Sequence, residues 1–301
     1  MVMSLSRLQI ATDILKEQTH AHESRAYGGQ SGEDQASPPL ALGASAVDHC
    51  LDGGLACGGL HEVRAEFARD IGAASGFALG LAARAAQVET CVRRGVVWVS
   101  EPATRVDGGS LFPAGLAQYG LDPSSMTIVE PGDLQGAMWA ADEASGCAGL
   151  AALVFQIKGN PARFDITATR RLMMRARQSG VLALILRQSG EEEASAAATR
   201  WRVNTEISGA DEIYQHGVGA MRLSLTLERN RTGRTGQWLL AWNPKTRVFC
   251  HAAPNKAHQR LTSANPPAHS RDRVSASSNR QDPSRKMGQV LDHRSDFGRA
   301  S

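Results

Sequence analysis

The chain has 301 residues, 42% of them apolar, which is enough for one large buried core and terminal segments besides. Its formal net charge is +3, but residues 254–301 alone hold nine Lys/Arg against four Asp/Glu, so the basic excess belongs to the C-terminal segment. Five scattered cysteines without a C-x-x-C pair argue against a zinc ribbon or a disulfide scaffold and suit a reducing cytosol. The sequence has neither an apolar signal-peptide region at its start nor an apolar run of membrane-spanning length, so we expect a cytoplasmic protein.

The N-terminal segment 1–39 divides into a predicted helix and a predicted linker. Apolar residues recur every three to four positions over Ser4–Gln18, which predicts an amphipathic helix. Thr19–Pro39 is polar, rich in Gly, Ser and Gln, and typical of a flexible linker. A helix on such a tether docks on a partner or packs on its own domain, and the sequence leaves both open.

Apolar runs alternate with amphipathic segments through residues 40–253, the predicted core domain. The predicted strands are Leu60–Ala65, Val96–Ser100, Met126–Val129, Leu150–Gln156 and Val181–Arg187. The predicted helices are Phe77–Val92, Leu111–Tyr119, Leu134–Ser145 and Ile166–Ser179. Several strands are almost wholly apolar, which indicates burial on both faces and therefore a mainly parallel sheet in an α/β fold.

The end of the core domain has a different pattern. Three more extended segments follow, namely Arg200–Glu206, Met221–Arg229 and Gly236–Trp242. The last two flank a turn-rich hairpin loop, so we expect the sheet to finish with antiparallel strands. Residues 254–301 contain few apolar side chains and are predicted to be a disordered basic tail, suited to weak attraction to DNA or to docking on a protein.

The connection after the first predicted strand has the layout of a phosphate-binding loop without its chemistry. In a P-loop, backbone N–H groups cradle the phosphates, a lysine meets the β/γ charge and a Ser/Thr hydroxyl holds Mg²⁺. We expect the loop to cover Glu66–Gly76, yet Phe77 stands at the lysine position and Ala78 at the hydroxyl position. The sequence therefore predicts a degenerate phosphate loop without a cofactor, built from Gly72, Ser75, Gly76, Phe77 and Ala78.

Several segments resemble RecA recombinases, and they occur in the same order. Residues 51–63 resemble the glycine-rich turn and strand that lead into the RecA ATPase core, and Val96–Glu101 resembles the strand ending in a catalytic glutamate. Gly180–Gln188 resembles the strand that ends in a nucleotide-sensing glutamine. Within that superfamily, residues 40–251 are most similar to the ImuA family. The resemblance implies a RecA-like, P-loop-type core.

The resemblance to the ImuA family also implies a function. It implies a non-catalytic accessory protein for SOS-induced, error-prone translesion DNA synthesis. The implied partner is ImuB, an inactive Y-family polymerase; an error-prone DnaE-type polymerase takes part indirectly, and RecA is a further candidate partner. Two alternatives stay open: a divergent RecA-type ATPase that binds nucleotide through an arginine such as Arg69, and a SulA-like inhibitor of cell division.

The same resemblance assigns positions to the catalytic groups of RecA. Glu101 takes the place of the catalytic glutamate, while Phe155 and Gln156 stand where the Walker B acid belongs. Without that carboxylate the water shell of Mg²⁺ has no anchor, so no metal site is expected. We interpret Glu101 as a relic or a solvated strand end, and we expect no catalytic residue.

The two RecA loops that grip DNA correspond to Ile157–Asp165 and Ser189–Thr199. The second carries Glu191, Glu192 and Glu193, which would repel phosphate. Arginines on the following helix and in the hairpin loop are candidate contacts for nucleic acid or a partner, although a solvated helix face and an exposed hairpin tip explain them equally well. The candidates are Lys158, Arg163, Arg170, Arg171, Arg175, Arg229, Arg231 and Arg234.

Overall fold

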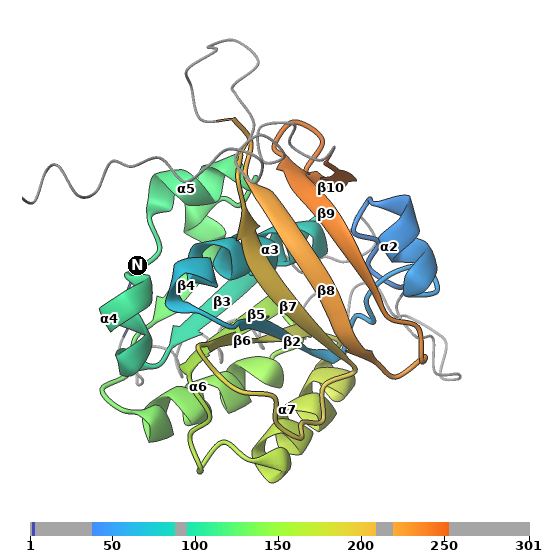
Figure 1. Ribbon diagram of the computed structural model, residues 1–301. Helices are drawn as coiled ribbons and strands as arrows, with labels where there is room; N and C mark the ends of the chain where they lie inside the picture. Colours follow the sequence, from blue (N-terminus) through green and yellow to red (C-terminus); the bar gives the residue numbers. More distant parts are fainter. Residues whose placement is uncertain (1, 4–37, 88–94, 209–218, 253–301) are drawn as a thin grey trace, which may run out of the picture. The chain divides into compact units, whose positions relative to one another are not determined.

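The computed structural model describes residues 2–3, 38–87, 95–208 and 219–252, and in these ranges ten strands form one sheet (Figure 1). The order across the sheet is β1-β4-β3-β5-β6-β2-β7-β8-β9-β10. Neighbours from β1 to β7 run parallel, and those from β7 to β10 run antiparallel. The strands are β1 Val2–Met3, β2 Leu60–Ala65, β3 Gly95–Ser100, β4 Met126–Val129, β5 Leu150–Lys158, β6 Leu182–Gln188, β7 Thr199–Glu206, β8 Arg222–Asn230, β9 Gly236–Asn243 and β10 Val248–His251.

This arrangement confirms the predicted α/β architecture, a mainly parallel sheet with antiparallel strands at its end. Every side chain of β2 and β6 is buried, as expected for strands covered on both faces. In β8 buried and partly exposed side chains alternate, as in a strand covered on one face. The predicted N-terminal helix, the linker up to residue 37 and the tail lie outside the described residues.

Helices cover both faces of the parallel strands. The α-helices are α2 Ser45–Cys50, α3 Ile71–Ala86, α4 Arg105–Gly108, α5 Pro113–Gln118, α6 Leu134–Ser145 and α7 Ile166–Ser179. Short 3₁₀ turns lie at η1 Ala68–Asp70, η2 Pro102–Thr104 and η3 Pro123–Ser125. In Figure 1, α6 and α7 lie below the parallel strands, and α3 lies on the opposite face.

Helices α6 and α7 have the bounds that the sequence predicts. Each begins after an aspartate whose carboxylate caps the first turn: Asp133 accepts from Gly136 N at 2.7 Å, and Asp165 accepts from Ala168 N at 2.9 Å. Helix α7 ends at Gly180, whose φ of +75° permits the left-handed turn. Local sequence therefore sets both helices.

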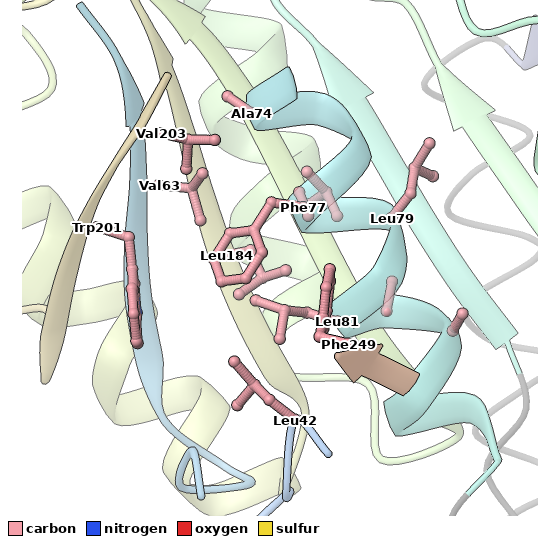
Figure 2. Close-up of a cluster of buried hydrophobic side chains, with 14 of the residues drawn as sticks. Leu42, Val63, Ala74, Phe77, Leu79, Leu81, Leu184, Trp201, Val203 and Phe249 are labelled. Carbon is pink, nitrogen blue, oxygen red and sulfur yellow. The ribbon is translucent and has the colours of Figure 1, made fainter. Parts of the chain in front are cut away.

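Two hydrophobic cores lie on the two sides of the sheet. The larger is enclosed by α3, the antiparallel strands and the segment around Leu42 (Figure 2). The smaller lies under α6 and α7, where Phe155 meets Phe164 with ring centroids 5.2 Å apart. Elements β1, α2, α4 and β10 are additions that the sequence did not predict.

Strand β2 carries a buried histidine between two partners. The Nε2 of His61 lies 3.1 Å from the carbonyl oxygen of Ala56, to which it donates, and its Nδ1 lies 2.9 Å from Thr199 Oγ1. Burial lowers the pKa of His61 from 6.5 to about 4. The neutral imidazole is therefore the form that the fold contains.

The His61 pKa predicts acid sensitivity. The unfolded chain takes up a proton below pH 6.5 and the folded chain only near pH 4, so stability is lost as pH falls through that window. Each pKa unit corresponds to about 1.4 kcal/mol, so we expect a loss approaching 3 kcal/mol at pH 4 from this residue. Urea unfolding of wild type and His61→Gln between pH 7.5 and 4.5 measures it, with a shallower pH slope for the variant. Equal slopes would contradict the assignment.

Candidate functional site

The carboxyl ends of the parallel strands meet at one edge of the sheet. Ligands of open α/β sheets bind outside this edge. The register places Lys158 of β5 beside Gln188 of β6, and Ala65 of β2 beside Gln188 on its other side. Ser100 of β3 lies beside Gln156 of β5. The predicted relic residues and the predicted phosphate loop should therefore converge here.

The predicted phosphate loop is wrong in its bounds. Helix α3 begins at Ile71 and not at Phe77, so Gly72, Ser75 and Gly76 lie in its first turns instead of in a loop. The connection from β2 is the five-residue segment Glu66–Asp70, which contains no glycine, serine or threonine. A P-loop needs a longer glycine-rich turn to aim its N–H groups at phosphate. This connection does not provide one.

Close packing explains two of the α3 glycines. A Cβ on Gly76 would lie 2.5 Å from the hydroxyl of Tyr119, and a Cβ on Gly80 would lie 2.4 Å from the ring of Phe249. Neither position has room for a side chain, although each lies in regular helix. The sequence pattern that resembles a phosphate loop is thus a small-residue face against which aromatic side chains pack.

The residue assigned to the lysine position lies in the core. Phe77 is fully buried, with ring centroids 5.5 Å from Trp201 and 5.2 Å from Phe249, and Figure 2 shows its ring directed into the cluster. Ala78, at the hydroxyl position, is fully buried as well. Both positions therefore belong to the hydrophobic core.

The 3₁₀ turn before α3 is held by protein contacts. Buried Asp70 accepts a hydrogen bond from Thr205 N at 2.8 Å. The guanidinium carbon of Arg69 lies 4.4 Å from the centroid of the Phe67 ring, and its Nε lies 3.8 Å from Asp70 Oδ2. Arg69, the arginine of the ATPase alternative, thus has contacts within its own turn.

A chain of polar contacts occupies the centre of the carboxyl edge. Glu101 Oε2 accepts from Lys158 N at 2.8 Å, and Lys158 Nζ pairs with Asp107 Oδ2 at 2.7 Å. Gln188 Nε2 lies 3.4 Å from the same Asp107 oxygen. The Oε1 of Gln188 accepts from Gln156 Nε2 at 3.4 Å. The structure therefore brings Glu101, Lys158 and Gln188 together, with Asp107 between Lys158 and Gln188.

Each of these side chains has a hydrogen-bond or ion-pair partner within the chain. Gln156 Oε1 accepts from Trp98 Nε1 at 3.1 Å, so the amide at the Walker B position points into the protein. Helix α4 closes over this pair, since a Cβ on Gly108 would lie 3.2 Å from Gln188 Oε1 and 3.3 Å from Gln156 Nε2. Sequence reasoning missed Asp107, because it lies in a short helix without a recognisable period.

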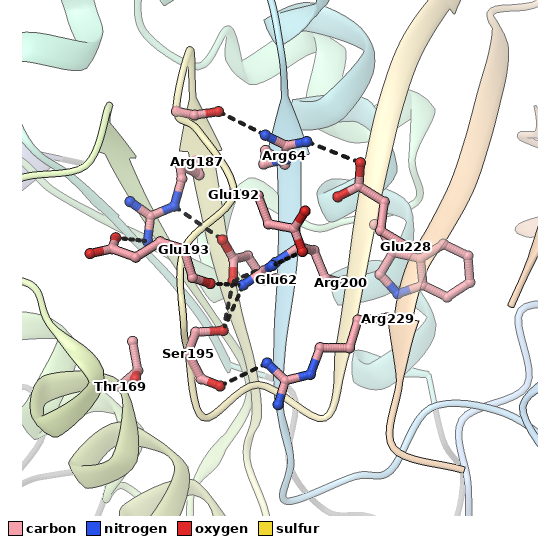
Figure 3. Close-up of polar contacts among 12 residues, drawn as sticks. Glu62, Arg64, Thr169, Arg187, Glu192, Glu193, Ser195, Arg200, Glu228 and Arg229 are labelled. Carbon is pink, nitrogen blue, oxygen red and sulfur yellow. Dashed lines mark hydrogen bonds and ion pairs between the residues drawn. The ribbon is translucent and has the colours of Figure 1, made fainter. Parts of the chain in front are cut away.

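The acidic segment after β6 folds onto a buried ion cluster, which Figure 3 shows. Fully buried Glu62 pairs with Arg187 Nε at 3.1 Å and with Arg200 Nε at 3.3 Å. Glu192 pairs with Arg200 at 2.9 Å, and Glu193 lies 3.8 Å from Arg187. Glu192 and Glu193, which the sequence predicted to repel DNA, thus pair with Arg200 and Arg187. These two buried arginines also share the carboxylate of Glu62.

The hairpin arginines also hold the molecule together. Arg229 donates to Ser195 O at 3.0 Å and Arg231 to Ala196 O at 2.9 Å, both on the connection between β6 and β7. Arg234 donates to His49 O at 3.1 Å and pairs with Asp52 at 3.0 Å. The structure uses the three side chains to fasten the β8–β9 hairpin to neighbouring segments.

The arginines of α7 divide into two sets. Arg171 pairs with Asp142 of α6 at 2.9 Å, and Arg175 pairs with Asp142 at 3.3 Å and with Glu143 at 3.2 Å. Arg163 and Arg170 are exposed, and within the described residues neither makes an ion pair. The eight candidate contacts therefore do not form one patch.

The described residues show neither a metal-binding cluster nor a membrane-spanning helix. No group of three or more His, Cys, Asp or Glu side chains in these ranges is arranged to hold a metal ion. Among the helices described, none is both long and apolar enough to cross a membrane.

Comparison with known proteins gives a family. No protein-family model matches the chain. Protein ImuA from two strains of Caulobacter vibrioides, NA1000 / CB15N and ATCC 19089 / CIP 103742 / CB 15, is 31% identical over 231 residues, covering 70% of this chain and 86% of the relative. A solved structure of the RadB recombinase has a TM-score of 0.48 and 17% identity, covering 71% of this chain and 100% of that one. On the ImuA match, the chain belongs to the ImuA family.

Proposed function

We propose that the protein is a non-catalytic RecA-like accessory factor for damage-induced, error-prone DNA synthesis, acting through an ImuB-like inactive Y-family polymerase. Membership in the ImuA family supports the pathway and favours it over the SulA-like alternative. The pathway and the partner come from what the family resemblance implies. The absence of catalysis comes from the chemistry of the site.

One observation carries the non-catalytic part of the proposal. The lysine position is Phe77, buried between Trp201 and Phe249, on a helix that starts six residues before the predicted position. Triphosphate carries several negative charges and needs cations or a row of N–H groups to meet them. Phe77 supplies neither, and the five residues before α3, which end in the 3₁₀ turn Ala68–Asp70, carry two carboxylates, Glu66 and Asp70.

The carboxyl edge supports the same conclusion. A hydrolytic glutamate must be able to orient a water beside a γ-phosphate. Glu101 instead accepts the backbone N–H of Lys158, while the lysine head pairs with Asp107. Through these contacts Glu101 and Lys158 connect the ends of β3 and β5 to α4. This is a structural role and needs no catalysis.

The proposal predicts that Glu101→Gln keeps its function. The amide oxygen of glutamine can still accept the Lys158 N–H, and no hydrolysis is required. We expect a strain that lacks the gene to lose damage-induced mutations, and both wild type and Glu101→Gln to restore them within about twofold, because the substitution keeps the acceptor for Lys158 N.

Two outcomes would contradict the proposed function. The first is a normal damage-induced mutation frequency in the strain without the gene. The second is a folded, normally expressed Glu101→Gln protein that fails to restore mutagenesis, because that result would require a chemical role for the carboxylate. Co-purification of the full chain with an ImuB-like protein from damaged cells tests the partner separately.

A further inference from the structure

Helix α7 presents three different sides. Its buried side, which includes Ala168, Leu172 and Ala176, packs on the sheet. A second side carries Arg171 and Arg175, which are neutralised by acids of α6. The remaining side has no partner within the described residues.

Four residues form a stripe along this free side, and we call them the α7 stripe: Ile166, Arg170, Met174 and Arg177. They are spaced by four, four and three, so at about 3.6 residues per turn they lie in one line along the helix. Ile166 is 38% exposed and Met174 is 54% exposed. Both arginines are exposed, and neither makes an ion pair with a described residue.

The neighbouring helix adds a further apolar side chain. Trp139 of α6 is 38% exposed and lies three residues before Asp142, which contacts α7. Trp, Met and Arg are the residue types enriched where proteins meet.

We infer that the α7 stripe docks an acidic amphipathic helix of another protein. Ile166 and Met174 lie two turns apart and fit anchors spaced i, i+7 on a facing helix. Arg170 between them and Arg177 beyond Met174 complement carboxylates on that helix. This inference rests on the proposed function, because it assigns a surface through which an accessory protein would act.

Charge argues against three other occupants. A second copy would bring the arginines of one stripe against those of the other, and like charges repel. The chain's own segment 254–301 is basic, with nine Lys/Arg against four Asp/Glu, so it has the wrong sign. A nucleic-acid backbone would satisfy the arginines but would leave Ile166 and Met174 in water.

The test uses the full chain and three probes of known composition. The first is a synthetic 20-residue helix with a leucine stripe flanked by glutamates, the second is the same helix with lysines for glutamates, and the third is a single-stranded 30-mer DNA. Fluorescence anisotropy measures the affinity of each. We expect the glutamate peptide to bind at least about tenfold more tightly than the lysine peptide, which corresponds to about 1.4 kcal/mol.

Substitutions within α7 locate the binding. The double variant Arg170→Glu/Arg177→Glu should weaken binding of the glutamate peptide about tenfold or more, and Met174→Ser about threefold. Arg171→Gln on the same helix is the matched control, and binding should stay within about twofold, since its charge is already paired with Asp142. Urea midpoints verify that all variants fold.

Three results would overturn the inference. One is no saturable binding of the glutamate peptide, and another is equal loss in the Arg171→Gln control. The third is DNA binding that the double variant abolishes and Met174→Ser leaves unchanged, because the stripe would then be a nucleic-acid contact. None of these affects the mutation-frequency assay of wild type and Glu101→Gln, so failure of the inference is distinguishable from failure of the proposed function.

Discussion

Glu62→Gln should destabilise the protein by about 3–5 kcal/mol, because the substitution leaves Arg187 and Arg200 buried without their shared carboxylate. Glutamine keeps the shape of the side chain, so the loss reports the charge and not a cavity. Ser195 Oγ also donates a hydrogen bond to Glu62 Oε2 at 2.8 Å, which connects the segment between β6 and β7 to β2. The urea unfolding midpoint is the measurement.

Glu192→Gln is the matched control for that experiment. Its side chain is 69% exposed, although it pairs with the same Arg200 at 2.9 Å. Exposed ion pairs contribute about 0–1 kcal/mol, so this variant should lose no more than that. Two results would contradict a stabilising role for the buried cluster. One is an equal loss of unfolding free energy in Glu62→Gln and Glu192→Gln. The other is a loss in Glu62→Gln of no more than about 1 kcal/mol, the upper end of the range for exposed ion pairs.

Phe77→Ala should cost about 3–5 kcal/mol, the range for removing a buried phenylalanine, because its ring packs against both Trp201 and Phe249. Phe77→Lys, which restores the residue type of a P-loop, should destabilise more, since it places an unpaired charge in that core. Phe112→Ala is the control, because its ring is 73% exposed. Thermal and urea unfolding measure all three. A stable Phe77→Lys protein with new affinity for Mg-ATP would contradict the placement of Phe77.

The sequence predicts those parts of the fold that local patterns control. Helices α6 and α7 and strands β2 and β4 have the predicted bounds, since capping aspartates and apolar runs mark them. The four-residue strand β10 was missed because it follows a tight turn at Arg247, whose φ is +55°, and is too short to show a period. The two-residue strand β1 is shorter still.

The start of α3 was missed for a different reason. Glycines have poor helix propensity, so Gly72–Gly76 favours a loop when the local sequence is considered alone. Tertiary packing overrides that preference, because Gly76 and Gly80 let Tyr119 and Phe249 approach the helix closely. The error therefore came from contacts between residues that are far apart in the chain.

The site shows the same division between local and long-range information. The resemblance to RecA matched Glu101, Gln156 and Gln188 to functional positions, and the register of the parallel strands brings all three to one edge of the sheet. The tasks of the charged residues did not follow from it. Glu62 pairs with Arg187 and Arg200, which lie 125 and 138 residues away in the sequence. No local sequence pattern encodes contacts over such separations.

The hairpin arginines illustrate the same limit. In the sequence, Arg229, Arg231 and Arg234 form a cationic cluster suited to phosphate. In the structure each donates to a backbone carbonyl of a neighbouring segment. Clustered charges in the sequence indicate a binding surface only where the folded chain leaves their side chains exposed and unpaired. Arg170 and Arg177 of the α7 stripe meet this condition among the described residues.

Calorimetric titration of the full chain with Mg-ATP, and with a nonhydrolysable analogue, tests the central claim most directly. We expect no saturable heat, because the strand-to-helix turn offers triphosphate no cradle and the lysine position is a core phenylalanine. Saturable binding with a dissociation constant in the micromolar range, about −8 kcal/mol, would contradict the account.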